Sequence, residues 1–292
     1  MATIAATMEQ RKLSAVRKAL FWWFRSPANP YICASFAVDT TGAQEYLARL
    51  STDHGRSVTI HHLVTAVVSR VLEEYPRAND RLGHGKLFRR RRTGLGMPVD
   101  LRADGRQGSQ ETAMAVIEDT DRLSLVQIAE GSRQAVRAER AHRSKLPWMR
   151  WLSRLGDAAP YPLLAPLLTS VDLVSRIPAV NDLLFGNLPG SGVTNVGASI
   201  EWQQGVLFRG GSMDIPQRLM HIGTVWGLSV IQDEVIPIDG EPAVRPMLPV
   251  VLCFDHRLFD GVYAGRLILR FCEILQNPAP VFGADGTARP AG

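Results

Sequence analysis

A histidine followed four residues later by an aspartate and a glycine is the group of residues in this sequence best suited to chemistry. The stretch 252–261 reads LCFDHRLFDG, so an apolar run leads to His256, and Asp260 and Gly261 follow just before a predicted helix. Because the ordinary pKa of histidine lies near neutrality, His256 can act as a general base. Asp260 can orient a local element by pairing with a cation, and Gly261 permits a tight turn. Taken alone, this spacing is more often structural than catalytic.

Hydrophobic periodicity predicts the elements that position these residues. Apolar residues at helical spacing indicate helices over residues 8–25, 40–50, 59–75, 124–140 and 262–275. Alternating or short apolar runs indicate strands over residues 32–38, 87–99 (in short pieces), 113–117, 192–197, 205–209, 220–232 and 249–254. A chain of 292 residues with this mixture of elements is long enough for one large α/β unit or two domains.

Residues 141–186 differ in kind from the rest. They are apolar but interrupted by prolines, which predicts short helices that form an inserted cap. The segment 281–292 is rich in Gly, Ala and Pro, and we expect it to be a flexible tail.

Composition narrows the class of ligand. The chain has 46% hydrophobic and 21% charged residues and a formal net charge of +5. A basic surface suits an anionic ligand such as a phosphate-bearing cofactor. The arginine run at 89–92 is expected at a solvated turn or strand end, and no nucleic-acid-binding module is recognised.

The longest apolar runs are too short for a membrane span or a signal sequence, so a cytoplasmic protein is expected.

Cysteines and histidines outside the main stretch are expected to be structural. Cys33, Cys253 and Cys272 all sit in apolar surroundings, which predicts buried free thiols in a reducing compartment. His61 and His62 are adjacent within a predicted helix and lack the spacing of metal ligands, so no metal site is predicted.

The motif Asp-His-Arg-x-x-Asp-Gly at 255–261 resembles the catalytic signature of the acyltransferase component of 2-oxoacid dehydrogenase complexes. The related chloramphenicol acetyltransferases and peptide-synthetase condensation domains carry His-His-x-x-x-Asp-Gly. Residues 63–82 resemble that family's helix ending in Pro-x-x-Asn, residues 94–101 its cofactor-side strand, and residues 124–133 the helix that follows. The resemblance covers most of residues 17–278 except the predicted insert.

This resemblance implies a fold and an assembly. It implies a chloramphenicol-acetyltransferase-like α/β fold, a mixed-sheet α+β sandwich, with a single acyltransferase domain in two halves over residues 8–280. It also implies a homotrimer in which His256 of one subunit faces Thr194 of its neighbour.

The resemblance also implies a reaction and its site residues. Coenzyme A or its acyl thioester is the expected substrate, and a small-molecule thiol, hydroxyl or amine is the expected acceptor. His256 removes the acceptor's proton, and Thr194, in a turn with Asn195, stabilises the oxyanion. Asp260 is an organiser that pairs with an arginine on the first helix, for which Arg17 is the best match. A positioned oxyanion donor typically contributes about 10²–10³ in rate.

Departures from the family keep alternatives open. No lipoyl domain, Ala-Pro-rich linker or subunit-binding domain is recognised, so the acceptor need not be a lipoyl group. A non-catalytic assembly or binding protein that retains the fold is one alternative. Another is a condensation-type enzyme that acts on carrier-protein thioesters, and a third is a chloramphenicol-type antibiotic acetyltransferase.

Overall fold

A computed structural model describes residues 8–11, 29–83, 85–100, 112–141, 161–175, 177, 179–180, 188–199, 203–213, 215 and 221–289. The strands are β1 (Met8–Arg11), β2 (Tyr31–Asp39), β3 (Arg81–Gly83), β4 (Lys86–Arg90), β5 (Leu95–Asp100), β6 (Thr112–Ile117), β7 (Ser191–Asn195), β8 (Thr224–Leu228), β9 (Gln232–Ile238) and β10 (Glu241–Asp255). The helices are α2 (Thr41–His54), α3 (Ile60–Glu74), α4 (Leu125–Arg140), α6 (Tyr161–Val174), α8 (Gly261–Gln276) and α9 (Ala279–Phe282), with 3-10 turns η2 (Pro76–Asn79), η3 (Thr120–Arg122) and η4 (Val196–Ser199).

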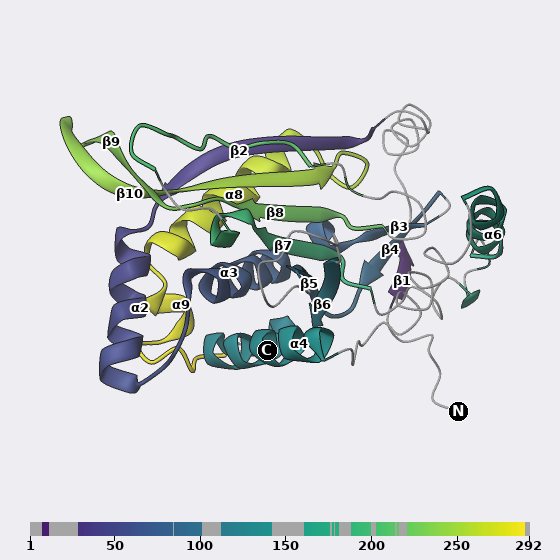
Figure 1. The fold of residues 1–292 in the computed structure, drawn as a ribbon, viewed down its shortest axis with the longest axis horizontal. Coiled ribbons are helices and arrows are strands. Elements are labelled where there is room, and N and C mark those ends of the chain that lie inside the picture. Colours follow the sequence, from purple (N-terminus) through teal and green to yellow (C-terminus); the bar gives the residue numbers. More distant parts are fainter. Residues whose placement is uncertain are drawn as a thin grey trace.

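Within these residues the strands form two sheets. A seven-stranded mixed sheet has the order β2-β10-β8-β7-β5-β6, with β9 paired to β10, and a small three-stranded sheet has the order β1-β4-β3. Strands β5, β7 and β8 run parallel, whereas β10 is antiparallel to β2, β8 and β9. Figure 1 shows α2, α3, α4 and α8 gathered alongside the large sheet. The predicted mixed-sheet α/β fold is confirmed.

The two faces of β10 are covered differently. Val250, Leu252 and Phe254 belong to the main core, which includes α8 residues such as Phe271. Val251 and its neighbours on the other face pack in a smaller cluster that contains residues of the segment 206–215. Because strand side chains alternate between faces, the strand that leads to the histidine motif is buried on both sides.

Side-chain caps explain where two predicted helices begin. Thr59 caps α3, and His62 completes a capping box because its Nδ1 accepts a hydrogen bond from the Thr59 N–H at 3.1 Å. Ser124 and Gln127 form the same box at the start of α4. Each box satisfies backbone N–H groups that the helix leaves without partners, so both predicted helices are confirmed with defined starts.

Three element predictions are wrong. Met8–Arg11, predicted as helix, is strand β1 and pairs with β4, while residues 12–25 of that prediction lie outside the described residues. Residues 205–209, predicted as a strand, form a turn and irregular backbone, because the Phe208 N–H and C=O bond the side chain of Gln232. The single strand predicted over 220–232 is instead β8 followed by β9, which forms a hairpin with β10.

The expectation of three free cysteines is also wrong. Cys33 of β2 and Cys253 of β10 stand directly opposite each other in the antiparallel register, with Cα atoms 4.1 Å apart, and form a disulfide. Cys272 is free. The pair is 220 residues apart in sequence, so only the strand pairing reveals it.

The structure describes part of the predicted insert and most of the predicted tail. Of the predicted insert, the structure describes mainly α6, a helix with Pro166 inside it, at the end of the molecule to which β10 leads (Figure 1). The tail was expected to be loose from residue 281, but Phe282 is fully buried. The Gly283 carbonyl also accepts a hydrogen bond from the Tyr46 hydroxyl at 2.7 Å. These contacts hold the start of the tail against the core, and its last three residues lie outside the described part.

None of the helices that the structure describes is long and apolar enough to cross a membrane.

Candidate active site

The histidine motif lies at the end of β10, where a short turn leads into α8. The His256 N–H donates to the Pro30 carbonyl at 3.0 Å, and the Leu258 N–H donates back to the Asp255 carbonyl at 2.9 Å. The first bond ties the motif to the residue before β2, and the second closes the turn. His256 is half-buried, so its imidazole is both held in place and reachable.

Packing of apolar side chains in the core holds this turn in place. Phe259 is fully buried, and its ring stacks on that of Phe254 with centroids 4.7 Å apart. Leu258 is buried against Gly223, where an added side-chain carbon would lie 2.7 Å from Leu258 Cδ1. The apolar residues of the motif therefore anchor the turn in the core on both sides of His256.

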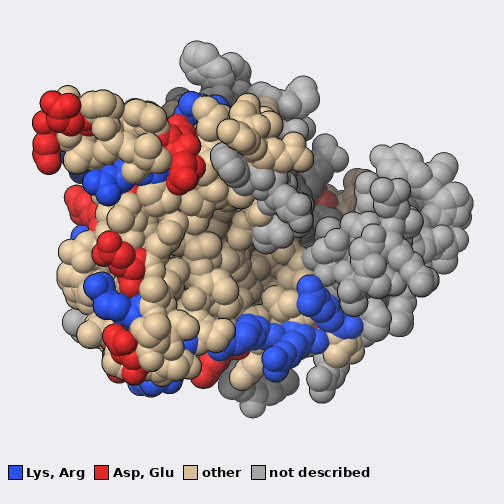
Figure 2. All heavy atoms as spheres, turned by 60° about the vertical axis from the view of Figure 1, so that its left-hand side comes forward, with Lys and Arg blue, Asp and Glu red and all other residues tan. Residues whose placement is uncertain are grey.

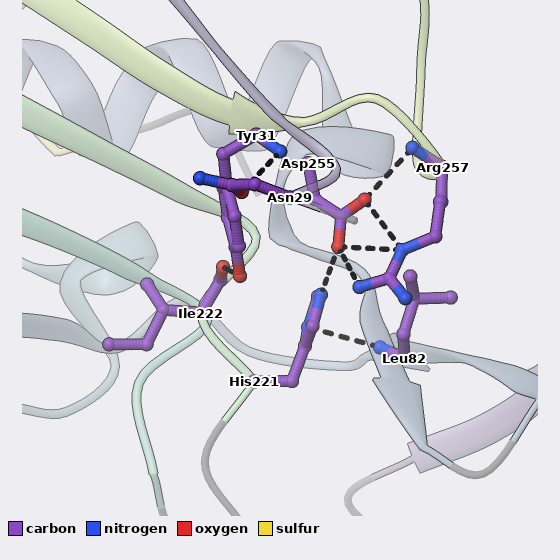
Figure 3. A network of polar contacts seen from close by, with 7 residues as sticks. All are labelled: Asn29, Tyr31, Leu82, His221, Ile222, Asp255 and Arg257. Atoms are coloured by element: carbon purple, nitrogen blue, oxygen red, sulfur yellow. Dashed lines mark hydrogen bonds and ion pairs between the residues drawn. The ribbon is translucent and has the colours of Figure 1, made fainter. Parts of the chain in front are cut away.

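Asp255 and Arg257 form a compact ion pair around the histidine. Asp255 Oδ1 accepts from the Arg257 backbone N–H at 2.9 Å and from Nε at 3.0 Å, and Oδ2 accepts from the guanidinium at 2.7 Å. Asp255 is fully buried. Figure 3 shows its carboxylate facing the Arg257 side chain. Charge-assisted bonds of this bidentate kind are strong and directional, so they fix the backbone on either side of His256.

His221 is the second partner of this carboxylate. Its Nε2 lies 2.8 Å from Asp255 Oδ2, and its Nδ1 accepts from the Leu82 N–H at 3.1 Å (Figure 3). Burial alone would raise the pKa of Asp255, but the hydrogen bonds from His221 and Arg257 outweigh it and lower that pKa to about 2. Asp255 is therefore a permanent anion at neutral pH.

Thr194 lies in β7 on the face of the sheet away from the helices. Val193 before it is fully buried in the main core, so the alternation of the strand turns Thr194 to the opposite face. A carbon added at Gly227 of β8 would lie 3.2 Å from Met213 Cε and 3.8 Å from Thr194 Cγ2. The Thr194 hydroxyl makes no hydrogen bond within the part of the chain that the structure describes, which leaves it available to a ligand.

The turn after Thr194 depends on a close backbone approach. β7 ends at Asn195 and continues as η4, which contains Gly197. A side chain at Gly197 would collide with the backbone of Ser229 at 2.3 Å. The glycine of this Thr-Asn-x-Gly sequence therefore lets η4 lie directly on the chain that follows β8.

The structure does not bring Thr194 and His256 together within one chain. Thr194 pairs with Gly227, and Gly227 pairs with Val251, which precedes His256 by five residues. At about 3.3 Å per residue, this amounts to about 16 Å along the sheet, with two strand spacings across it.

Asp260 lies at the start of α8. It caps α8, since its Oδ1 accepts from the Tyr263 N–H at 3.0 Å, and the residue is exposed in this chain. Arg17, its expected partner, lies outside the described residues. Gly261 has no positive φ and would meet no atom within 4 Å if it carried a side chain, so the expected tight turn that requires glycine is not found there.

A basic pocket of about 290 Å³ lies where α3, α4 and β5 meet. It is lined by His61, His62, Met97, Pro98, Val99, Ser132, Arg133, Val136, Arg137 and Arg140. Its three arginines follow one another at spacings of four and three, so they share one side of α4. Figure 2 shows Lys and Arg side chains in a row beside a hollow in the uncharged surface. Such a pocket suits a phosphate-bearing ligand.

Burial governs the charge of the two histidines of this pocket. Burial, followed by the neighbouring His61 and Arg133, lowers the pKa of His62 to about 4, and burial also lowers that of His61. Both rings are therefore neutral at neutral pH. Within the described ranges, no group of three or more potential ligands could hold a metal ion.

Comparisons with known proteins agree with this fold and motif. Residues 222–282 match the family model of the 2-oxoacid dehydrogenases acyltransferase catalytic domain. The dihydrolipoyllysine-residue succinyltransferase component of the 2-oxoglutarate dehydrogenase complex of Rickettsia bellii is 33% identical over 54 residues, which are 18% of this chain and 14% of that protein. The matched part is thus a small fraction of the length of the curated relatives.

Solved structures extend the likeness to nearly the whole chain. Azotobacter vinelandii dihydrolipoamide acetyltransferase, studied for the role of a serine, a histidine and an asparagine in its catalytic mechanism, superposes with a TM-score of 0.59. It is 18% identical, and the match covers 93% of both chains. Chloramphenicol acetyltransferase superposes with a TM-score of 0.51 at 14% identity, over 91% of this chain and all of that one.

This chain has the fold of the 2-oxoacid dehydrogenase acyltransferase catalytic domain. In this acyltransferase fold, the family match covers β8, β9, β10 and α8, and therefore includes the His256 turn. The matched homologues are acyltransferases. Thr194 lies outside the matched segment.

Sequence reasoning missed the roles of the residues that hold the turn. His221 has no spacing relation to the motif, and only the fold brings it to Asp255. The pairing of Asp255 with Arg257 had a signal, because opposite charges two residues apart flank the histidine.

Proposed function

We propose that this chain transfers an acyl group from coenzyme A, or a related thioester, to a thiol, hydroxyl or amine acceptor. The observation that carries the proposal is the His256 turn, held by Asp255 and Arg257 within the segment that matches the acyltransferase catalytic domain. Three residues named for the Azotobacter enzyme support it. The histidine and asparagine named for that enzyme are four positions apart, as are His256 and Asp260, although this chain has an aspartate in the second position. We take Thr194 as the hydroxyl residue that corresponds to its serine.

The proposed reaction needs one base and one oxyanion donor. The neutral imidazole of His256 takes the proton from the acceptor's S–H, O–H or N–H, and the acceptor's freed electron pair forms a bond to the thioester carbonyl carbon. The resulting oxyanion accepts a hydrogen bond from the Thr194 hydroxyl. Collapse of this intermediate breaks the carbon–sulfur bond, and His256 returns the proton to the departing coenzyme A thiolate.

This mechanism requires more than one copy of the chain. Because Thr194 and His256 lie far apart within one chain, a single site has to take them from different subunits. A closed ring of identical subunits gives every His256 a neighbour's Thr194, and we propose a homotrimer on the likeness of the fold.

The basic pocket is the proposed site for the phosphate groups of coenzyme A. β5 pairs with β7 at Gly96 and Gly192, and two residues further on lie Pro98 of the pocket and Thr194. The pocket therefore borders the strand next to the oxyanion donor. Arg137 and Arg140 are exposed at its rim, where they can form bidentate hydrogen bonds with phosphate oxygens.

A panel of acyl-coenzyme-A thioesters tests this proposal. The parent protein and a His256→Ala variant are incubated with each thioester, with and without dihydrolipoamide, and free thiol is measured. Release that depends on both an acceptor and His256 supports the proposal. A carrier-protein thioester as sole effective donor favours a condensation enzyme, and tight coenzyme A binding without turnover favours a binding protein.

A further inference from the structure

His221 joins two parts of the fold that are distant in sequence. It lies just before β8, is buried, and stands between the end of β10 and the small sheet that contains β3. Figure 3 shows its ring between the Asp255 carboxylate and the backbone of Leu82. The residue that follows His221 is also held, since the Ile222 carbonyl accepts from the Tyr31 hydroxyl at 3.0 Å.

The two bonds of His221 define its protonation. Nδ1 accepts the Leu82 N–H, so it carries no proton, and the proton of the neutral ring is on Nε2. Nε2 therefore donates to Asp255 Oδ2. Burial lowers the pKa of His221 and favours this neutral form; the hydrogen bond and charge of Asp255 oppose the shift, and the positive charges of Arg257 and Arg81 add to it. A ring in this state does not move protons at neutral pH, but it is a rigid link with one donor and one acceptor.

Asp255 transmits this link to the catalytic turn. Its Oδ2 is shared between His221 and the Arg257 guanidinium, and its Oδ1 accepts the Arg257 backbone N–H. Both oxygens are thus engaged, and rotation of the carboxylate would break contacts on either side of His256. Without the bond from His221, the Arg257 side chain is the remaining side-chain donor to Oδ2 in the described residues.

We propose that His221 is a positioning residue for the acyl transfer proposed above, because it clamps the Asp255 carboxylate to β3 and so fixes the backbone that presents His256. The inference rests on the proposed function, since it assigns the clamp a catalytic consequence. His221 acts through Asp255 and touches no reacting atom, so we expect the loss of the His221 side chain to lower kcat more than it changes KM.

Two substitutions divide the clamp into its halves. In His221→Asn the amide oxygen takes the place of Nδ1, which preserves the bond from Leu82 and removes the bond to Asp255. In His221→Gln the amide nitrogen takes the place of Nε2, which preserves the bond to Asp255 and removes the other. Because a small displacement of a catalytic group can lower the reaction rate about 100-fold, we expect kcat to fall about 10- to 100-fold in the Asn variant. The Gln variant should retain most of kcat, and KM for the acyl donor should stay within about twofold in both.

Ser69→Ala is the matched control for a buried hydrogen bond lost elsewhere. Ser69 is fully buried in α3 and donates to the Thr120 hydroxyl at 2.8 Å, away from the His256 turn. The Ser69→Ala variant should have a lower free energy of unfolding than the parent and the same kcat. If the parent transfers acyl groups and both His221 variants match its kcat, the clamp has no catalytic role, although the proposed function stands. A parent that shows no transfer with any thioester overturns the function and this inference together, and a higher kcat in the Asn than in the Gln variant overturns the inference alone.

Discussion

Thr194 and His256 belong to one sheet, yet in a single chain they are two strands apart and offset by five residues along the strands. Each is placed by local contacts of its own: β7 and the Gly197 turn hold Thr194, and Asp255 with Arg257 holds His256. The two residues proposed for catalysis thus lie at separate places in one chain. This arrangement makes direct predictions for variants that lack one of the two side chains.

Loss of the side chain of His256 or of Thr194 should abolish most of the acyl-transfer activity without unfolding the protein. His256→Ala removes the proposed base, and we expect kcat to fall about 10²–10⁴-fold. Thr194→Ala removes the oxyanion donor, and we expect a fall of about 10²–10³-fold. A mixed assembly, formed by co-expression of the two variants, should recover activity, since about one quarter of randomly paired sites would contain both residues. Recovery is measured on the purified mixture. If the mixture is as inactive as each variant alone, the site does not lie between subunits.

Charge reversal in the basic pocket should weaken donor binding. Arg137→Glu and Arg140→Glu each remove a proposed phosphate contact, and we expect KM for the acyl donor to rise about 10-fold, equivalent to about 1.4 kcal/mol. The turnover number should change little, because the pocket does not touch the reacting atoms. Arg49→Glu, an exposed change on α2, controls for the overall loss of positive charge. Equal KM values in the pocket and control variants would place the phosphates elsewhere.

Asp260 should contribute as a helix cap. Asp260→Ala removes the acceptor for the Tyr263 N–H, and we expect a loss of about 1 kcal/mol in the free energy of unfolding. Asp260→Asn, which still caps, should lose much less. Denaturant unfolding of the two variants distinguishes this role from a buried ion pair, whose disruption costs about 3–5 kcal/mol. A loss of that size in both variants would favour the ion pair with Arg17.

Secondary structure is predicted best from the sequence where a local side-chain contact or a local run of apolar residues determines it. Thr59 and Ser124 begin helices because their side chains cap them, and the apolar run before His256 is a buried strand as expected. The hairpin of β9 and β10 also has a local signal in the sequence, the Asp239-Gly240 turn, where both residues have positive φ.

Features that depend on pairing between distant segments were not predictable. Met8–Arg11 becomes a strand because β4 is available to pair with it, and its own sequence carries no alternation. His221 reaches Asp255 only through the order of β8 and β10 in the sheet. Cys33 and Cys253 likewise meet only through the register of two antiparallel strands.

The disulfide should be directly countable. Of the three cysteines, Cys33 and Cys253 are bonded, so denatured protein that has not been reduced should show one reactive thiol and fully reduced protein three. Replacing both Cys33 and Cys253 by Ala should lower the free energy of unfolding by about 2–4 kcal/mol. Cys272→Ala, as control, should remove the single thiol and leave the disulfide intact. Three thiols before reduction would contradict the pairing.

Acidification should destabilise the fold below about pH 6.5, the ordinary pKa of histidine. Burial lowers the pKa of His221, and it lowers that of His62 to about 4. The unfolded chain therefore binds protons that the folded chain does not, and stability is full above pH 6.5 and falls as pH drops from there toward the folded pKa. Each such histidine contributes a slope of up to about 1.4 kcal/mol per pH unit. Asp255 does not share this window, because its pKa of about 2 makes its contribution disappear only between about pH 4 and pH 2.

Thermal unfolding between pH 7.5 and pH 5 measures this effect. His62→Asn keeps an acceptor for the Thr59 N–H but does not titrate, so its Tm should fall less steeply with pH than that of the parent. Ser69→Ala should lower the Tm by a similar amount at every pH, because it removes a buried hydrogen bond and no titrating group. A parent Tm that is constant or rises as the pH falls from 6.5 to 5 would show that these histidines are accessible to protons in the folded state.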